Sequence, residues 1–87
     1  MKLTFDPAKD EVNRAKHGVS LARAADLEPE IFVADERHDY GEPRTRVFGT
    51  IDGETYCLVF TVREAQVRAI SLRRAHLKEY KRHVSKG

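Results

Sequence analysis

The chain has 87 residues, a single Cys and a formal net charge of +2 at pH 7. This length predicts one domain over residues 1–87 with a single thin core. One Cys excludes an internal disulfide and a cysteine-based metal site, so Cys57 is interpreted as a packing residue.

The chain has no apolar run near the ~20 residues of a membrane span and no signal-peptide core, which favours a soluble cytoplasmic protein without membrane contact. Its charges are segregated by sign. The stretch 26–42 is mostly acidic and the stretch 73–86 mostly basic. This asymmetry indicates a basic surface for nucleic acid or for an acidic partner, and the alternative is a solvated face without a ligand.

The N-terminal part predicts a short strand over Lys2–Phe5 and two helices. Asp6 is suited to cap the first helix, which Gly18 ends. Ser20 is suited to cap the second, from Leu21 to about residue 27. The residues expected to face the core are Ala8, Val12 and Ala15 in the first helix and Leu21, Ala24 and Ala25 in the second.

An apolar patch at residues 31–33 is consistent with a helical extension, a short strand or an anchoring loop. A period of two then predicts strands over Thr45–Ile51, Glu54–Arg63 and Val67 to about Arg73. A two-residue Asp-Gly turn at 52–53 would pair Ile51 with Glu54 and place Val47 opposite Leu58.

The middle strand, Glu54–Arg63, is apolar on both faces, which is typical of a central strand covered on both sides. It ends in Arg63. If Arg63 pairs with Val67, Arg63 and Arg73 share a face but lie far apart, whereas a one-residue slip places Arg68 on the Arg63 face.

The last segment predicts a C-terminal helix, with His76, Leu77, Tyr80 and Val84 at helical spacing. The predicted fold class is therefore α+β. We expect a small antiparallel sheet of three to four strands, packed with two N-terminal helices and a C-terminal helix.

The groups that could carry chemistry are mostly cations: Lys16, His17, Glu42, Arg44, Arg63, Arg73, His76 and Tyr80. The sequence has no Gly-rich phosphate loop and no His pair at metal spacing, so we expect neither cofactor nor metal. Cations with one acid or base suit RNA phosphodiester cleavage. That reaction needs a base for the 2′-OH, positive charge on the phosphorane and an acid for the leaving oxygen.

Each of these residues also has a purely structural interpretation. Lys16 and His17 could cap a helix C-terminus, and Glu42 could pair with Arg44 to anchor a loop. The strand-end arginines could lie in water without a ligand, and His76 and Tyr80 could serve helix packing.

Taken together, the motifs resemble the BrnT family, toxins of type II toxin–antitoxin pairs with a RelE-like fold. The resemblance runs from Phe5 to Tyr80. It rests on Phe5-Asp6-Pro7-x-Lys9, Asn13-x-x-Lys16-His17-Gly18-Val19-Ser20, Gly41-Glu42-x-Arg44, Phe60-Thr61-x-Arg63, Ile70-Ser71-x-Arg73-x-Ala75 and Glu79-Tyr80. The sequence departs from the family at Phe5, where many relatives carry Trp, at Leu21, usually aromatic, and at Leu72, commonly small.

The resemblance implies a cytoplasmic, metal-independent endoribonuclease of bacteria or archaea that inhibits translation. A cognate DNA-binding antitoxin would neutralise it, and the pair would reach operator DNA through the antitoxin. The catalytic residues implied are Lys16, His17, Glu42, Arg63 and Arg73, and the RNA-binding residues are Phe5, Arg44 and Arg74.

In the mechanism expected from these positions, Arg63 and Lys16 hold the scissile phosphate and Arg73 is an outer phosphate contact. Either His17 or Glu42 exchanges protons with the 2′-OH or the leaving group. The competing hypotheses are a non-catalytic protein- or nucleic-acid-binding module and a family member that has lost its activity.

Overall fold

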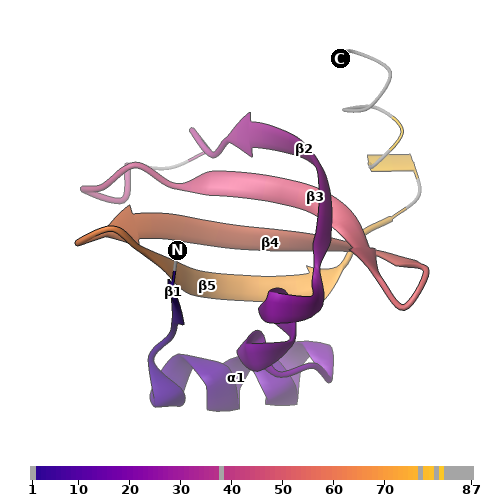
Figure 1. The fold of residues 1–87 in the computed structure, drawn as a ribbon, viewed down its shortest axis with the longest axis horizontal. Helices are drawn as coiled ribbons and strands as arrows, with labels where there is room; N and C mark the ends of the chain where they lie inside the picture. The colour runs from indigo at the N-terminus through magenta and orange to yellow at the C-terminus, as the bar shows by residue number, and fades with distance from the viewer. Residues whose placement is uncertain (1, 38, 77, 80, 82–87) are drawn as a thin grey trace.

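Figure 1 shows the fold in a computed structural model, which describes residues 2–37, 39–76, 78, 79 and 81. One five-stranded sheet has the spatial order β1-β5-β4-β3-β2. In chain order the elements are β1 (Lys2–Thr4), α1 (Pro7–His17), the 3₁₀ helix η1 (Leu21–Asp26), β2 (Glu28–Ala34), β3 (Thr45–Ile51), β4 (Glu54–Arg63) and β5 (Gln66–Arg74).

The α+β class predicted from the sequence is confirmed, and three details of the fold differ. The sheet has five strands rather than three or four, and β1 pairs in parallel with β5. The second helix is a 3₁₀ helix, so the two N-terminal α-helices of a RelE-like arrangement are not matched in detail. The apolar patch left undecided, residues 31–33, is part of strand β2.

The predicted C-terminal helix falls mostly on residues outside the described part of the chain. Within the described part, Lys78, Glu79 and Lys81 are helical. None of the described helices is long and apolar enough to cross a membrane.

The β3–β4–β5 meander follows from two tight turns. Asp52 and Gly53 adopt positive φ angles of 52° and 78°, and Ile51 pairs with Glu54, as predicted. Primed turns of this kind match the twist of the strands that they join. Glu64 and Ala65 form the second turn, with φ angles of 52° and 61°.

The register of β5 places more arginines on one face than expected. Arg63 pairs with Gln66, not with Val67, and Thr61 pairs with Arg68. Ile70 is an extra residue in β5, because Phe60 pairs with Ala69 and Val59 with Ser71. This bulge shifts the register by one residue, so that Cys57 pairs with Arg73. Arg68 and Arg73 therefore both project from the face that carries Arg63.

Helix α1 has the predicted ends. Asp6 accepts a hydrogen bond from the Ala8 N–H (2.9 Å), and Gly18 closes the helix in the left-handed region (φ 71°). The predicted apolar stripe is wrong, because Val12 is 63% exposed and its companions Ala8 and Ala15 are also exposed. The helix lies along β5, and its one buried side chain is Asn13 (Figure 1).

The main core lies on the sheet face that η1 covers, which we call the helix face. Leu21 of η1 is fully buried there against Val47, Leu58 and Leu72. The prediction for Ala25 is wrong, because this residue is exposed. A smaller cluster of Phe48, Cys57 and Ala75 covers the other face, so β4 is central and packed on both sides, as predicted.

Candidate active site

The predicted catalytic residues, together with the predicted RNA-binding residue Arg44, lie in two groups at opposite ends of the β4–β5 pair. Lys16, His17 and Arg73 form one, which we call the helix group. Glu42, Arg44 and Arg63 form the other, which we call the loop group. Because Arg73 pairs with Cys57, and Arg63 is the last residue of β4, their backbones are roughly 20 Å apart at about 3.3 Å per residue.

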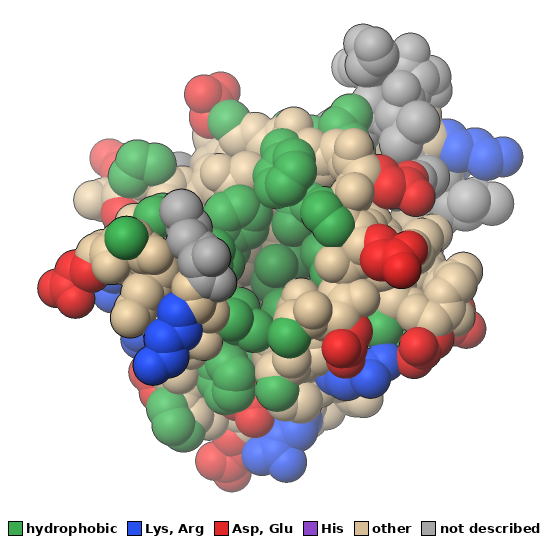
Figure 2. Space-filling view, in the orientation of Figure 1, with side chains coloured by type: hydrophobic (Ala, Val, Ile, Leu, Met, Phe, Trp, Pro, Cys, Tyr) green, Lys and Arg blue, Asp and Glu red, His purple; other side chains and the backbone are tan. Residues whose placement is uncertain are grey.

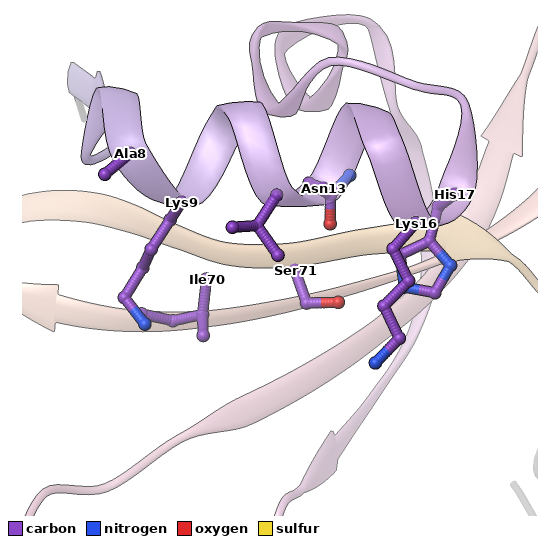
Figure 3. Close-up of a pocket in the computed structure, with 8 residues that line it drawn as sticks. Ala8, Lys9, Asn13, Lys16, His17, Ile70 and Ser71 are labelled. Carbon is purple, nitrogen blue, oxygen red and sulfur yellow. The ribbon is translucent and has the colours of Figure 1, made fainter.

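The helix group lies where α1 ends beside β5. Lys16 and His17 occupy the last turn of α1, where cations interact favourably with the terminal carbonyls. Their side chains border a groove of about 340 Å³ between the helix and the strand, and Lys9 and Lys16 both extend from the helix past β5 (Figure 3). The floor of the groove is formed by Ile70 and Ser71.

Asn13 holds this helix end against the strand. Beyond the short β1 pairing, the outer edge of β5 leaves the N–H and C=O of Leu72 without a strand partner. The Asn13 amide bonds both, accepting from the N–H (3.1 Å) and donating to the carbonyl (2.9 Å), and also donates to the Val19 carbonyl (2.8 Å). Asn13 therefore places the end of α1 beside Arg73, the residue after Leu72.

His17 is neutral at pH 7 in this setting. Burial lowers its pKa from the ordinary 6.5, and the charges of Lys16 and then Arg73 lower it further. A neutral imidazole between two cations can accept a proton, and the same cations can stabilise negative charge on a nearby phosphate.

Arg73 is anchored by a carboxylate. Its guanidinium donates to both carboxylate oxygens of Glu79, at 2.9 and 3.3 Å, and this pair lowers the pKa of Glu79 and raises that of Arg73. The charge of Arg46 also acts on Glu79. The buried Nε of Arg46 has no hydrogen-bond partner among the described residues, so this side chain brings unused donor capacity near the helix group.

In the loop group, one carboxylate holds two arginines. Glu42 accepts from Nε of Arg63 (3.1 Å) and from its Nη2, and Nε of Arg44 lies 3.6 Å from the other oxygen. The hydrogen bond from Arg63 is the main cause that lowers the pKa of Glu42. Glu42 is therefore a tightly held anion at pH 7, which makes it a weak base.

The loop that carries Glu42 is held in place at both ends. Thr61, buried in β4, donates its hydroxyl to the Pro43 carbonyl (2.7 Å). The Asp35 N–H donates to the Arg44 carbonyl (2.8 Å), and the Arg44 guanidinium lies 4.0 Å from the centre of the Tyr40 ring. These contacts fix Glu42 and Arg44 where Arg63 ends the strand.

Asp35 organises the start of this loop. Its side chain is 1% exposed and accepts from Nε (2.8 Å) and Nη2 (3.0 Å) of Arg37 and from the Tyr40 hydroxyl (3.3 Å). The Arg37 hydrogen bonds lower the Asp35 pKa to about 2, against an opposing effect of burial.

Between the two groups, arginines line the face opposite the helix face, which we call the arginine face. Arg46 projects there opposite Val59, and Arg68 opposite Thr61. They lie between Arg73 at one end and Arg63 at the other. Neither Arg46 nor Arg68 forms an ion pair with another residue in the described part of the chain.

Two of the predicted RNA-binding residues lie outside both groups. Phe5 is half-buried and packs against the main core. Arg74 pairs with Glu54 (2.8 Å) and lies 5.6 Å from the centre of the Tyr56 ring. It is opposite Tyr56, on the helix face rather than the arginine face. Of the remaining candidates, His76 is exposed and Tyr80 lies outside the described residues.

Four residues that position or line the site were not predicted as site residues: Asn13, Thr61, Arg46 and Arg68. Asn13 stands in a motif already noted, but its partner Leu72 is 59 residues away in the sequence. Thr61 belongs to a motif already noted, but its partner, Pro43, is distant in sequence. The face of Arg68 could be assigned only once the pairing of Arg63 with Gln66 was known.

Metal ligands do not cluster in the part of the chain that the structure describes: no three His, Cys, Asp or Glu side chains there come together as a possible metal site.

Comparison with known proteins gives one family. No curated protein matches the chain. Residues 5–79 match the family described as "Ribonuclease toxin, BrnT, of type II toxin-antitoxin system", which covers the helix group, the loop group and strands β2 to β5. The chain therefore belongs to the BrnT family of ribonuclease toxins of type II toxin–antitoxin systems.

Proposed function

We propose that this chain is an endoribonuclease that cleaves RNA without a metal and inhibits translation, and that a cognate DNA-binding antitoxin neutralises it. The observation that carries the proposal is the helix group. A histidine held neutral at pH 7 lies beside Lys16 and Arg73, at the end of a face lined with arginines. Family membership supports the ribonuclease activity and the antitoxin partner.

In the proposed mechanism, His17 accepts the proton of the 2′-OH. The 2′ oxygen then attacks the adjacent phosphorus and the bond to the 5′ oxygen breaks, leaving a 2′,3′-cyclic phosphate. Lys16 and Arg73 stabilise the negative charge of the phosphorane, and solvent protonates the leaving 5′ oxygen. Base catalysis of this kind contributes roughly 10²–10⁴ in rate, and each electrostatic donor about 10²–10³.

The loop group serves a different phosphate of the same strand. Its separation from Arg73 by roughly 20 Å argues against a shared contact with the scissile phosphate. We assign Arg63 and Arg44 to a flanking phosphate and Glu42 to holding their guanidinium groups in place. Arg46 and Arg68 then lie along the path between the two phosphates, on the arginine face.

One observation favours the alternative of a non-catalytic binding module. Arg63 and Arg73 are each already paired with a carboxylate, which suits arginines that only stabilise the fold. In that case, however, His17 would have no role beyond the end of α1.

The direct experiment incubates the purified chain with RNA in EDTA and analyses the new RNA ends. Wild type should produce 2′,3′-cyclic phosphate ends, and His17→Gln should lower the cleavage rate by at least about 10². Glu11→Gln is the control, because Glu11 is an exposed residue of α1 outside both groups. No cleavage by wild type, or cleavage only with added metal, would refute the mechanism.

A further inference from the structure

The helix face carries a shallow apolar hollow that the chain's own helices leave open. It has a volume of about 170 Å³ and lies beside the end of η1 (Figure 2). Its walls come from η1, the segment after it and four strands. The lining residues are Ala24, Leu27, Pro29, Phe32, Val47, Leu58, Phe60 and Val67.

Large apolar side chains are exposed around this hollow. Phe32 is 60% exposed and contacts Phe60 edge to face, with the ring centres 6.3 Å apart. Val62 is 50% exposed and pairs with Val67 on the same face. Contiguous exposed apolar surface on a small protein marks an interaction site.

The dimensions of the hollow fit a helix from another protein. Small-molecule sites usually enclose about 300–1,000 Å³, whereas this hollow has room for only one or two large side chains. Its floor extends over three neighbouring strands, β3, β4 and β5, a width of roughly 10 Å that matches the diameter of a helix. An added strand would instead pair with the outer edge of β2, away from this floor.

The charges beside the hollow indicate a basic partner. Glu30, an exposed residue of β2, follows the lining residue Pro29 at the β2 bulge and forms no ion pair with any described residue. Figure 2 shows acidic side chains beside the apolar hollow. A second copy meeting this face across a two-fold axis would bring the same acidic residues with it, so the charges favour a different chain.

We propose that this hollow anchors an amphipathic helix of the antitoxin. One or two large apolar side chains of that helix fill the hollow, and a flanking Lys or Arg residue faces Glu30. Only the identity of the partner rests on the proposed function. Because the hollow and the arginine face are on opposite sides of the sheet, the anchor leaves the RNA path uncovered, and a separate part of the antitoxin has to block it.

The test measures affinity for the purified product of the reading frame beside this gene, by calorimetry. Phe32→Asp should weaken binding about tenfold or more, because a buried aromatic anchor is replaced by a charge. Glu30→Lys should weaken it by a smaller factor. Glu11→Lys, the same charge change at an exposed position of α1, should leave the affinity unchanged. All variants are first checked for cooperative unfolding, and Val62→Asp replaces Phe32→Asp if the latter does not fold.

Cleavage of RNA by each variant without antitoxin separates this proposal from the proposed function. We expect all of them to cleave RNA at the wild-type rate. Weaker antitoxin binding by Phe32→Asp in a protein that never cleaves RNA would support the anchor and refute the ribonuclease. Wild-type affinity in both Phe32→Asp and Val62→Asp would overturn the anchor. Conversion of a dimer to a monomer with unchanged antitoxin affinity would overturn it in favour of a second copy.

Discussion

The helix group and the loop group are similar in composition and different in chemistry. Each has an arginine held by a carboxylate, Arg73 by Glu79 and Arg63 by Glu42. Only the helix group adds a side chain that is neutral at pH 7 and able to take a proton, His17. In the loop group the only base is Glu42, and the arginine hydrogen bond lowers its pKa.

This difference teaches that the same direction of pKa shift has different consequences for a histidine and for a carboxylate. From the sequence, His17 and Glu42 were equivalent candidates. In the structure both pKa values are lowered, that of His17 first by burial and then by nearby positive charge, and that of Glu42 chiefly by the hydrogen bond from Arg63. The effect makes His17 a neutral base near pH 7 and makes Glu42 a weak base throughout the physiological range.

The largest expected effect distinguishes the two arginines. Arg73→Met should lower kcat for RNA cleavage by about 10²–10³, because Arg73 stabilises charge that develops at the scissile phosphate. Arg63→Met should chiefly raise KM, since a flanking phosphate is bound equally in the ground and transition states. Steady-state kinetics on a short RNA measures both. Equal losses of kcat in the two variants would break the assignment of different roles.

The next effect concerns Asn13, which positions the helix group. Asn13→Leu leaves the N–H and C=O of Leu72 without their partner and should lower the free energy of unfolding by about 3 kcal/mol. It should also lower kcat, because Lys16 and His17 lose their position beside Arg73. Urea unfolding and cleavage kinetics test this. Ala15→Leu, at an exposed position of the same helix, is the control and should change neither quantity.

Acid stability should report on Asp35. Its pKa is lowered from 3.8 to about 2, so its ionised form stabilises the fold above pH 4, and this stabilisation is lost as the pH falls toward 2. Asp35→Asn should therefore cost on the order of 2 kcal/mol at pH 6 and much less at pH 2. Urea unfolding at several pH values measures the difference. A cost independent of pH would show that the ion pair with Arg37 does not stabilise the fold.

The smallest effect is expected at Thr61. Thr61→Val keeps the shape of the side chain but removes the hydrogen bond to the Pro43 carbonyl, at a cost of about 1 kcal/mol. Because this bond holds the loop that carries Glu42, the variant should raise KM in the same sense as Arg63→Met while leaving kcat nearly unchanged. A fall in kcat alone would separate Thr61 from the loop group.

Local signals predicted those parts of the fold that depend on neighbouring residues. The Asp6 cap, the Gly18 end of α1 and the Asp52-Gly53 turn all act within a few residues, and all three are observed. The same is true of the Lys16–His17 pair, which adjacency in the chain brings to one helix end.

Contacts between segments far apart in the chain could not be predicted from local sequence patterns. The burial of Asn13 depends on an edge of β5 that β1 leaves open, and β1 is more than 60 residues away in the chain. The bulge at Ile70 sets which arginines share a face, and no turn residue marks it. The sequence also left open whether Arg68 shares the face of Arg63, which the pairing of Arg63 with Gln66 decides.

The central claim is that His17, rather than Glu42, takes the proton from the 2′-OH. The pH dependence of kcat for RNA cleavage tests it in wild type, His17→Gln and Glu42→Gln. Because the His17 pKa is lowered from 6.5, the wild-type rate should reach half its maximum at a pH below 6.5, as the imidazole becomes protonated. This acidic limb should disappear in His17→Gln and persist in Glu42→Gln. An acidic limb that persists in His17→Gln and is lost in Glu42→Gln would contradict the account.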